Sequence, residues 1–409
     1  MKYITSLLLL FFFYNSSAQI DTVFTQALFD LLEKEAYQEV IERTNNRDSL
    51  SETDKYYRGY SFLLLEQEDR ALELFDEVIA SDSNSTGSRY LKSAIHFGRK
   101  EFDIALSTIN DAIQVDATDA DFYALRSEIY YYKDQTANAI ADLEQCVALR
   151  DSSVSNYMNL ASLYFEEDQL DKAAKTYLAV EQFISPKHEL FDDYTYSSGL
   201  TAFLRADYQL AAKRFEVLHG KRESPFLTAL LIQTYYQLEK YEAGNALKPV
   251  LYKAWEAGTL PDDIKNDFVL EEFEWKGQKI RVYERFDESK DRILFYKHVF
   301  YLFNEAGNMT TTIQTEWSGA LDTSDKEYVL GKSVFDPATG NKLAHYSYFS
   351  HVFDKEVDYK ALKNAVIGVL EGKIDPSSSS SFGTPSTDVP SKKRKKRKRK
   401  KKKKQVKKI

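Results

Sequence analysis

Apolar residues recur every three or four positions through most of the first 260 residues, which is the spacing of helices that bury one face. Residues 154–183 show the pattern well, because two such stretches lie on either side of the polar turn at 166–169. Each stretch is long enough for several helical turns. The pattern predicts a series of helix pairs joined by short turns.

The helix pairs repeat at a regular interval along the chain. The interval from Ala71 to Ala105 recurs between Ala105 and Ala139 and between Ala139 and Ala173, and Ala211 follows after a slightly longer one. A small residue in the first helix of a pair, expected to face this alanine, lets the two helix axes approach closely. We call a set of equivalent positions in successive repeats a column. Besides the alanine column, a column of small residues, a column of mostly large residues and a column of apolar residues recur at the same interval. They are Gly59, Ser93, Ser127, Ala161 and Gly199; Phe75, Ile109, Leu143, Tyr177 and Phe215; and Val78, Ala112, Cys146, Val180 and Leu218.

This pattern resembles the tetratricopeptide repeat family, whose period of about 34 residues equals the interval of the alanine column. The match covers roughly residues 23–257 and is clearest in the unit that begins at Val154. The resemblance implies a right-handed solenoid of about five to seven helix pairs over residues 19–260, in which each pair contacts only its neighbours. Incomplete pairs at 26–43 and 228–255 are expected to extend the array. The matching residues of the clearest unit are Tyr157, Leu160, Ala161, Tyr164, Ala173, Tyr177 and Val180.

The resemblance also implies protein–protein interaction and a binding surface. In this family the first helices line the inner face, where residues three before and four after the small position project inward. Here those positions are rich in aromatic residues, which suit an extended or helical peptide or a protein partner. Packing of the same rings between repeats is the alternative. The predicted partner-binding residues are Tyr56, Tyr90, Phe97, Tyr131, Phe165, Tyr196, Phe203 and Tyr236.

Beyond Pro261 the apolar residues alternate with polar ones, as expected for strands with one buried face. Turns that contain glycine or asparagine separate six such segments, which predicts an antiparallel meander. The amphipathic stretch at 359–373 is expected to close one face as a helix. The predicted fold class is α+β: an all-α solenoid at 19–260, then a small antiparallel β domain with a C-terminal helix at 261–375. The six predicted strands are 268–275, 279–286, 292–303, 310–318, 328–335 and 342–350.

The sequence lacks the common catalytic and cofactor-binding motifs. It has no glycine-rich phosphate loop, no nucleophile elbow, no histidine pair at the spacing of a zinc helix and no cysteine cluster. Cys146 falls in the apolar column of the repeat and is expected to be a core residue. His298, His345 and His351 lie on or next to predicted strands, and an enzyme or metal site built from them is the minor alternative. The sequence favours a protein that is not an enzyme and uses no cofactor and no metal.

The two ends of the chain differ in composition from the rest. Residues 1–18 contain an apolar run followed by small residues, which is typical of a secretory signal and predicts export to the periplasm or the exterior. The run is shorter than the roughly 20 residues that span a bilayer, so no transmembrane helix is expected in the mature chain. A linker rich in serine and proline at 376–391 precedes thirteen consecutive basic residues at 392–404. Linker and basic tail are expected to be disordered.

The basic tail favours anionic partners, which for an exported protein are membrane lipids, polysaccharides or released nucleic acid. Sequence-specific reading of nucleic acid is not expected, because no aromatic residues interleave the basic ones. Association with the rest of the protein is an alternative, since fifteen of the 55 Lys and Arg residues lie at 392–409, a segment that contains none of the 63 Asp and Glu residues. The predicted anion-binding residues are Lys392, Lys393, Arg394, Lys395, Lys396, Arg397, Lys398, Arg399 and Lys400.

These features favour a non-catalytic interaction scaffold of the cell envelope or secreted space. Its solenoid would bind a peptide or protein, and its tail would tether it to an anionic surface. The alternative is an envelope module whose main ligand is an anionic polymer or membrane bound by the tail, with the solenoid as a spacer. Fold alone does not choose between them, because one fold supports many functions.

Overall fold

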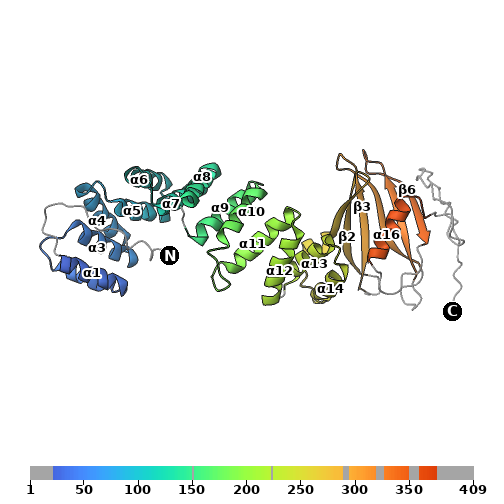
Figure 1. The fold of residues 1–409 in the computed structure, drawn as a ribbon, viewed down its shortest axis with the longest axis horizontal. Coiled ribbons are helices and arrows are strands. Elements are labelled where there is room, and N and C mark those ends of the chain that lie inside the picture. Colours follow the sequence, from blue (N-terminus) through green and yellow to red (C-terminus); the bar gives the residue numbers. More distant parts are fainter. Residues whose placement is uncertain are drawn as a thin grey trace, which may run out of the picture. The chain divides into compact units, whose positions relative to one another are not determined.

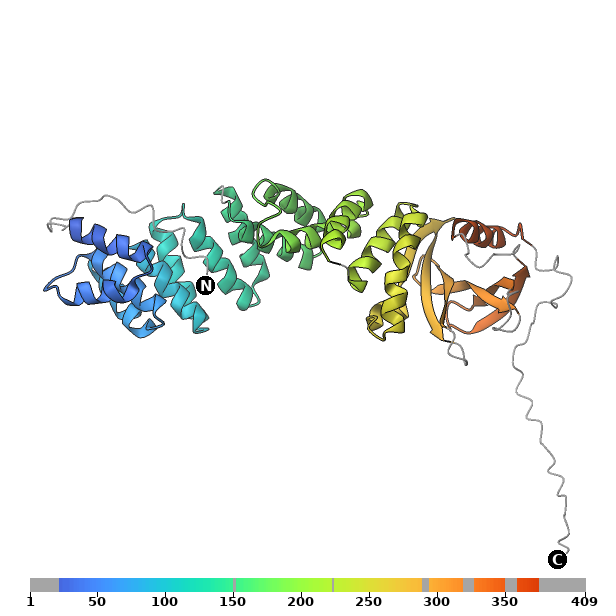
Figure 2. The ribbon, with the colours of Figure 1, turned by 90° about the horizontal axis from the view of Figure 1, so that it is seen from below.

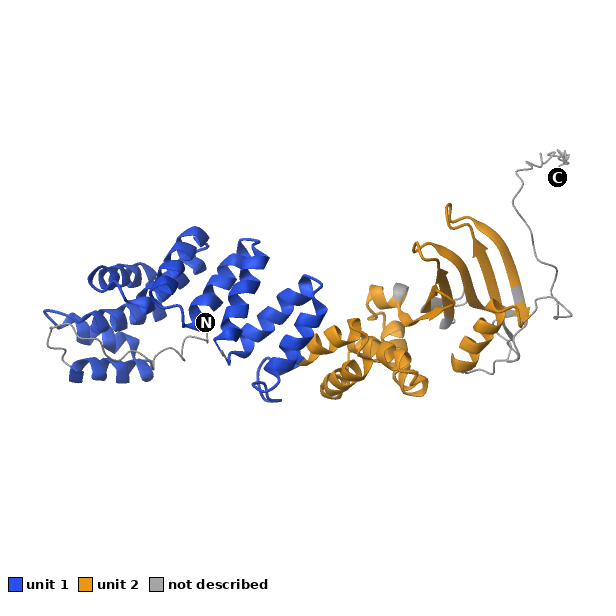
Figure 3. Cartoon of the chain, turned by 45° about the horizontal axis from the view of Figure 1, so that its top comes forward, with its two compact units in different colours: residues 1–194 blue, residues 195–409 orange. Residues whose placement is uncertain are grey.

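The computed structural model describes residues 22–149, 152–222, 224–288, 294–318, 327–349 and 359–374. The chain divides into two compact units, residues 1–194 and 195–409 (Figure 3). In the described residues, unit 1 consists of helices and unit 2 combines helices with a sheet. The predicted signal segment at 1–18 and the predicted linker and tail at 376–409, including the anion-binding residues 392–400, lie outside the described residues.

The helices follow one another in pairs joined by short turns (Figure 1). Serine begins several first helices: the hydroxyls of Ser51, Ser153 and Ser224 accept from backbone N–H groups of the first turn, which have no partner within the helix. No described helix is long and apolar enough to cross a membrane. The helices of unit 1 are α1 (Thr22–Glu33), α2 (Tyr37–Asn45), α3 (Glu52–Leu64), α4 (Glu68–Ser81), α5 (Thr86–Gly98), α6 (Phe102–Val115), α7 (Ala120–Tyr132), α8 (Thr136–Ala148), α9 (Val154–Glu166), α10 (Leu170–Val180) and the start of α11 (Phe191–Leu204).

Every pair turns in the same way. Between α5 and α6 the Lys100 N–H donates to the Phe97 carbonyl at 2.9 Å, and the Glu101 N–H donates to the His96 carbonyl at 2.8 Å. This is the Schellman arrangement, in which one residue after the helix adopts a left-handed conformation. The same turn recurs in the two end pairs, whose sequences match the repeat poorly, so the described residues contain seven pairs of one kind. The left-handed residues, with φ between 55° and 62°, are Glu35, Glu66, Lys100, Asp134, Asp168, Ala206 and Glu239.

The small column of the repeat lies where the two helices of a pair meet. A Cβ atom added to Gly59 would lie 2.8 Å from the Phe75 ring, so a larger side chain has no room there. In the next pair the Ser93 hydroxyl donates to the Ala105 carbonyl at 2.9 Å. The expected close approach of the two helices is confirmed. The neighbour nearest to Gly59 is the Phe75 ring rather than Ala71.

Unit 2 contains one antiparallel sheet whose six strands pair in the order of the sequence. The predicted meander is confirmed, and each predicted strand boundary lies within two residues of the observed one. Helix α16 lies across one face of the sheet (Figures 1 and 2). The remaining elements of this unit are α12 (Tyr208–Lys221), α13 (Pro225–Gln237), α14 (Tyr241–Glu256), α15 (Asp262–Asp267), β1 (Val269–Trp275), β2 (Gln278–Glu288), β3 (Leu294–Phe303), β4 (Met309–Ser318), β5 (Glu327–Phe335), β6 (Lys342–Phe349) and α16 (Tyr359–Leu370).

The core of unit 2 is shared by helices and sheet. The register pairs Ile280 with Leu302 and Val282 with Phe300, and all four side chains are at most 1% exposed. Residues two apart on a strand point to the same face, so these side chains form one apolar surface. The core continues across residue 261, where the sequence suggests a domain boundary. The same cluster includes Tyr236 of α13, Leu251 of α14, and Leu362 and Val366 of α16.

Glu284 of β2 is a charged residue inside this core, with a fully buried side chain. The Lys248 ammonium of α14 lies 2.5 Å from one carboxylate oxygen, and the Tyr252 hydroxyl donates to the other at 2.7 Å. His298 is the direct partner of Glu284 on β3. Burial opposes ionisation of Glu284, but Lys248, His298 and the hydrogen bonds together hold its pKa below the usual range. Burial and the charge of Lys248 lower the pKa of His298 to about 4.

A second buried acid, Glu271 of β1, is held by two helices. It accepts from the Tyr359 hydroxyl at 2.7 Å and the Lys363 ammonium at 2.6 Å, both on α16, and from the Tyr241 hydroxyl of α14 at 3.2 Å. Hydrogen bonds to a buried charged group are among the stronger ones in proteins. The sheet is therefore fixed to α14 and α16 by specific polar contacts as well as by apolar packing.

Candidate functional site

The first helices of the second to fifth pairs each present one stripe of side chains spaced three or four residues apart, and such residues share one face of a helix. We call these positions the first-helix surface. It includes five of the eight predicted partner-binding residues. Its members are Thr53, Tyr56 and Leu63 of α3; Gly87, Tyr90, Ala94 and Phe97 of α5; Asp121, Ala124, Glu128 and Tyr131 of α7; and Ser155, Met158, Ser162 and Phe165 of α9.

Tyr56 and Tyr90 are half-buried on this surface because their rings pack against other helices. The Tyr56 ring centroid lies 6.0 Å from that of Phe75 in α4, and the Tyr90 centroid lies 5.8 Å from that of Phe122 in α7. Burial raises the pKa of both hydroxyls. Both rings have a packing role, and the exposed part of each is held in a fixed place.

Tyr131 is the most exposed of the predicted aromatic residues, at 48%, and its neighbour Tyr132 is 62% exposed. The Tyr132 ring centroid lies 5.4 Å from Phe97 and 5.9 Å from Phe102, on which it stacks. We call Phe97, Phe102, Tyr131 and Tyr132 the aromatic cluster. Sequence reasoning missed Phe102 and Tyr132, because their columns are not regularly aromatic in the other pairs. The run of three tyrosines at 130–132 was the available signal.

The charged groups of the first-helix surface are both acids, Asp121 and Glu128; none of its positions is Lys or Arg. Glu128 is solvent-exposed, yet enough protein surrounds its carboxyl group for desolvation to raise its pKa. Burial raises the pKa of the nearby Tyr90 hydroxyl, and the negative charges of Asp121, Glu128 and Asp119 raise it further. Three carboxylates therefore lie close enough to the Tyr90 hydroxyl to disfavour its ionisation.

Three other predicted residues are half-buried beside aromatic or apolar neighbours. Phe165 packs against the core around the fifth pair. In unit 2, the Tyr196 ring centroid lies 6.5 Å from that of Phe226, and the Phe203 centroid lies 5.5 Å from that of Tyr208. Phe203 and Tyr208 repeat the arrangement of Phe97 and Phe102, five residues apart across the turn of a pair.

Tyr236 differs from the other predicted residues, because its side chain is 0% exposed. Its ring lies 5.2 Å from Tyr241 and 4.8 Å from Tyr359, between the last helix pair and α16. Contact with a partner is therefore not expected at this position. Where the earlier pairs have a small residue, the last pair has Ile232, and this departure from the repeat was the signal in the sequence.

Cys146 and the described histidines of the sheet lie in packed or hydrogen-bonded surroundings. Cys146 is buried and its thiol donates to a backbone carbonyl of α7 at 3.3 Å, as expected for a core residue. His298 on β3 is buried, and His345 on β6 is half-buried and lies 3.0 Å from the Ser333 hydroxyl. Strands β4 and β5 lie between the two histidines. His351 lies outside the described ranges. Within those ranges, no group of three or more His, Cys, Asp or Glu residues could hold a metal ion.

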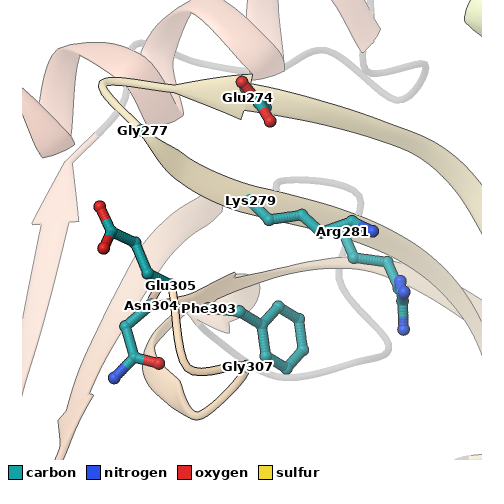
Figure 4. A pocket seen from close by; sticks show the side chains of 8 residues that line it. All are labelled: Glu274, Gly277, Lys279, Arg281, Phe303, Asn304, Glu305 and Gly307. Carbon is teal, nitrogen blue, oxygen red and sulfur yellow. The ribbon is translucent and has the colours of Figure 1, made fainter.

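An open pocket of about 510 Å³ lies between two hairpin turns at one end of the sheet (Figure 4). Its two cations are already paired: Glu272 lies 2.5 Å from the Lys279 ammonium and 2.8 Å from the Arg281 guanidinium. The volume is in the range of small-molecule sites. The lining is polar and charged, with two carboxylates and two cations. The lining residues are Glu274, Gly277, Lys279, Arg281, Phe303, Asn304, Glu305 and Gly307.

The seven helix pairs share the same kind of turn, and the pairs between the two ends repeat with a period of about 34 residues and pack a small residue of the first helix against the second. The helices have the fold of a tetratricopeptide-like repeat array. No family model matches the chain, and no curated protein matches it.

Several solved structures are similar to the repeat array. One is the C-terminal part of a TPR repeat-containing protein from Cytophaga hutchinsonii, with 17% identity and a TM-score of 0.45, covering 57% of this chain and 98% of that one. PilF of Pseudomonas aeruginosa has 15% identity and a TM-score of 0.43, covering 54% and 96%. YrrB, a TPR protein with an unusual peptide-binding site, has 17% identity and a TM-score of 0.37, covering 47% and 95%.

Proposed function

We propose that the protein is a non-catalytic scaffold whose repeat array binds a segment of a partner protein on the first-helix surface and the adjoining aromatic cluster. The aromatic cluster is the observation that supports this proposal. Tyr131 and Tyr132 are 48% and 62% exposed, while Phe97 and Phe102 pack against the Tyr132 ring. Rings of this kind provide a large contact area, and a ring already held by its neighbours loses little entropy when a partner covers it.

The turns beside the cluster are tied to the preceding pair. The Arg99 guanidinium donates to Glu68 at 2.7 Å and to Asp69 at 2.8 Å, and the Lys133 ammonium lies 2.5 Å from Asp103. Exposed ion pairs of this kind add little stability, and here they join each turn to the pair before it. The aromatic rings are thus presented on a preorganised surface.

The proposed ligand is an extended or helical segment that lies along α3, α5, α7 and α9. Such segments bind through a few side chains that fill spaces between aromatic residues of the receptor. Export, a place in the cell envelope and tethering through residues 392–400 are hypotheses that rest on the sequence alone.

The test is a comparison of matched variants of the full mature chain. A Tyr131→Ala, Tyr132→Ala double variant removes the exposed rings, and Leu178→Ala on α10 removes an apolar side chain that is 70% exposed on a second helix. Each protein is used to retain partners from envelope and secreted fractions at low and high salt, with helicity measured by circular dichroism as a folding control. A retained protein is then titrated by calorimetry.

We expect the double variant to weaken binding of the retained protein by about tenfold or more, as for loss of central aromatic residues at an interface. The Leu178→Ala variant should bind as the wild type does. Equal binding by all three proteins would refute the proposed surface. Binding that requires residues 391–409 and disappears at high salt would instead favour the tail as the main ligand-binding element.

A further inference from the structure

Each lysine and arginine of α5 and α7 already has a partner away from the first-helix surface. Arg89 donates to a backbone carbonyl at 3.1 Å, and Lys92 pairs with Asp76 of α4. Arg126 donates to both carboxylate oxygens of Asp142 in α8, at 2.8 and 2.7 Å. These cations are therefore not available to an acid on the first-helix surface.

Glu128 is such an acid, and it has no hydrogen bond and no ion pair to any residue that the structure describes. It lies four residues after Ala124 and three before Tyr131, so the three side chains share one face of α7. Its charge acts on the Tyr90 hydroxyl of α5. The surrounding protein removes part of the water around the carboxylate, which raises its pKa. A cation beside a partly desolvated carboxylate is attracted more strongly than one beside a fully hydrated carboxylate.

Tyrosine rings lie near this carboxylate on both helices. The Tyr90 ring is held against Phe122 of α7, with 5.8 Å between the ring centroids, and Tyr131 is 48% exposed. The faces of aromatic rings attract ammonium and guanidinium groups. A cation on this part of the surface therefore gains from the rings and from Glu128, whereas an anion would meet like charge.

We propose that the partner segment carries a basic residue, lysine or arginine, whose cation binds the Glu128 carboxylate beside Tyr90 and Tyr131. This inference rests on the proposed function, because it names the chemistry of the partner that the same surface takes. The rings give contact area to many segments, and Glu128 selects among them for positive charge. Arginine fits both groups, since its planar guanidinium can stack on a ring and donate to a carboxylate.

Two synthetic peptides test the inference on the full mature chain. In peptides of about twelve residues, serine alternates with arginine in one and with glutamine in the other, which keeps length and extended character the same. Binding is measured by calorimetry at about 150 mM salt, where distant charges are screened. Glu128→Gln is the test variant. Glu166→Gln is the matched control, since Glu166 is an exposed acid at the end of α9 and the same charge is lost. Circular dichroism checks that both variants are folded.

We expect the arginine peptide to bind at least about tenfold more tightly than the glutamine peptide. Glu128→Gln should weaken binding of the arginine peptide by about fivefold, while Glu166→Gln should change it by less than about twofold, as for an exposed charge outside the contact. Equal losses in the two variants would mean that the peptide follows the net charge of the chain, and would overturn the inference. Equal binding of the two peptides would overturn it as well.

The protein retained in the test of the proposed function tells failure of this inference apart from failure of that function. If Glu128→Gln and the Tyr131→Ala, Tyr132→Ala double variant both weaken its binding, both ideas are supported. If only the double variant weakens it, the partner surface stands and the contact with a basic residue is wrong. If neither variant weakens it, both ideas fail.

Discussion

His298 should make the stability of unit 2 depend on pH between about 7 and 5. Its side chain is 5% exposed, and burial together with the charge of Lys248 lowers its pKa to about 4. In the unfolded chain the imidazole returns to its ordinary pKa of about 6.5. Below this pH the unfolded state binds a proton that the folded state does not, so the free energy of unfolding falls as the pH falls. The contribution of neutral His298 is complete above pH 6.5 and is lost progressively down to about pH 4.

The size of the effect follows from the two pKa values. Each unit of separation corresponds to about 1.4 kcal/mol, so lowering the pH from 7 to 5 should decrease the free energy of unfolding by roughly 2 kcal/mol. The range above pH 5 keeps this effect apart from that of Glu284. Because the pKa of Glu284 is lowered, its contribution is present above the ordinary pKa of about 4.5 and is lost at lower pH.

Tryptophan fluorescence provides the assay, since Trp255, Trp275 and Trp317 are the three tryptophans of the chain and all lie in unit 2. Urea titrations at pH 7 and pH 5 give the free energy of unfolding for the wild type and for His298→Gln. We expect the difference between the two pH values to be roughly 2 kcal/mol smaller in the variant. His345→Gln is the matched control for the chemical change. An equal pH difference in the wild type and in His298→Gln would show that this histidine is not the group responsible.

Three further predictions concern the same unit and the same assay. Tyr359→Phe should lower the free energy of unfolding by about 1.5–3 kcal/mol, because it removes a hydrogen bond to a buried carboxylate. Tyr235→Phe removes a hydrogen bond to an exposed carboxylate and should lower it by less than about 0.5 kcal/mol. Similar losses in the two variants would contradict the role given to burial. Gly244→Ala should destabilise the unit by about 1–2 kcal/mol, because the added Cβ would lie 2.7 Å from the fully buried ring of Tyr236. Gly220→Ala has open space around it and should stabilise the unit by about 0.5–1 kcal/mol. Stabilisation by both substitutions would mean that the Tyr236 ring moves aside easily. A fragment that starts at residue 261 should show no cooperative urea transition, because it lacks the helices that complete its core, and a sharp transition would contradict the shared core.

Local features of the fold could be predicted from the sequence because each depends on neighbouring residues. The evenly spaced alanine column, the small residue at Gly59 and the alternation in the strands all describe which face of one element is buried. These features gave the helix pairs, the order of the strands and the helix after the sheet. They also identified Tyr131 as a candidate surface residue, because the repeat specifies which positions of a first helix face inward.

The contacts between elements could not be predicted in the same way. Glu271 and Glu284 look like solvent-facing acids on strands, and their partners Lys363 and Lys248 lie on helices that are distant in the sequence. A charged residue is normally exposed unless it is paired, and the sequence does not show the pairing. The burial of Tyr236 has the same origin, because the sheet and α16 cover a position that faces the surface in the earlier pairs.

The left-handed turn residues bear on how the array can evolve or be engineered. None of the seven is a glycine, although glycine adopts this conformation without steric penalty and other residues do so at a cost of roughly 1 kcal/mol or more. Repeat stabilities are approximately additive along an array, so glycine at several of these turns could raise stability by several kcal/mol in total. Two of these turns, at Lys100 and Asp134, bond to the carbonyls of Phe97 and Tyr131 and so lie next to the aromatic cluster, whereas Glu35 and Glu239 lie in the two end pairs. The repeat thus contains a series of equivalent positions at which thermal tolerance can change, and those in the end pairs are not on the first-helix surface.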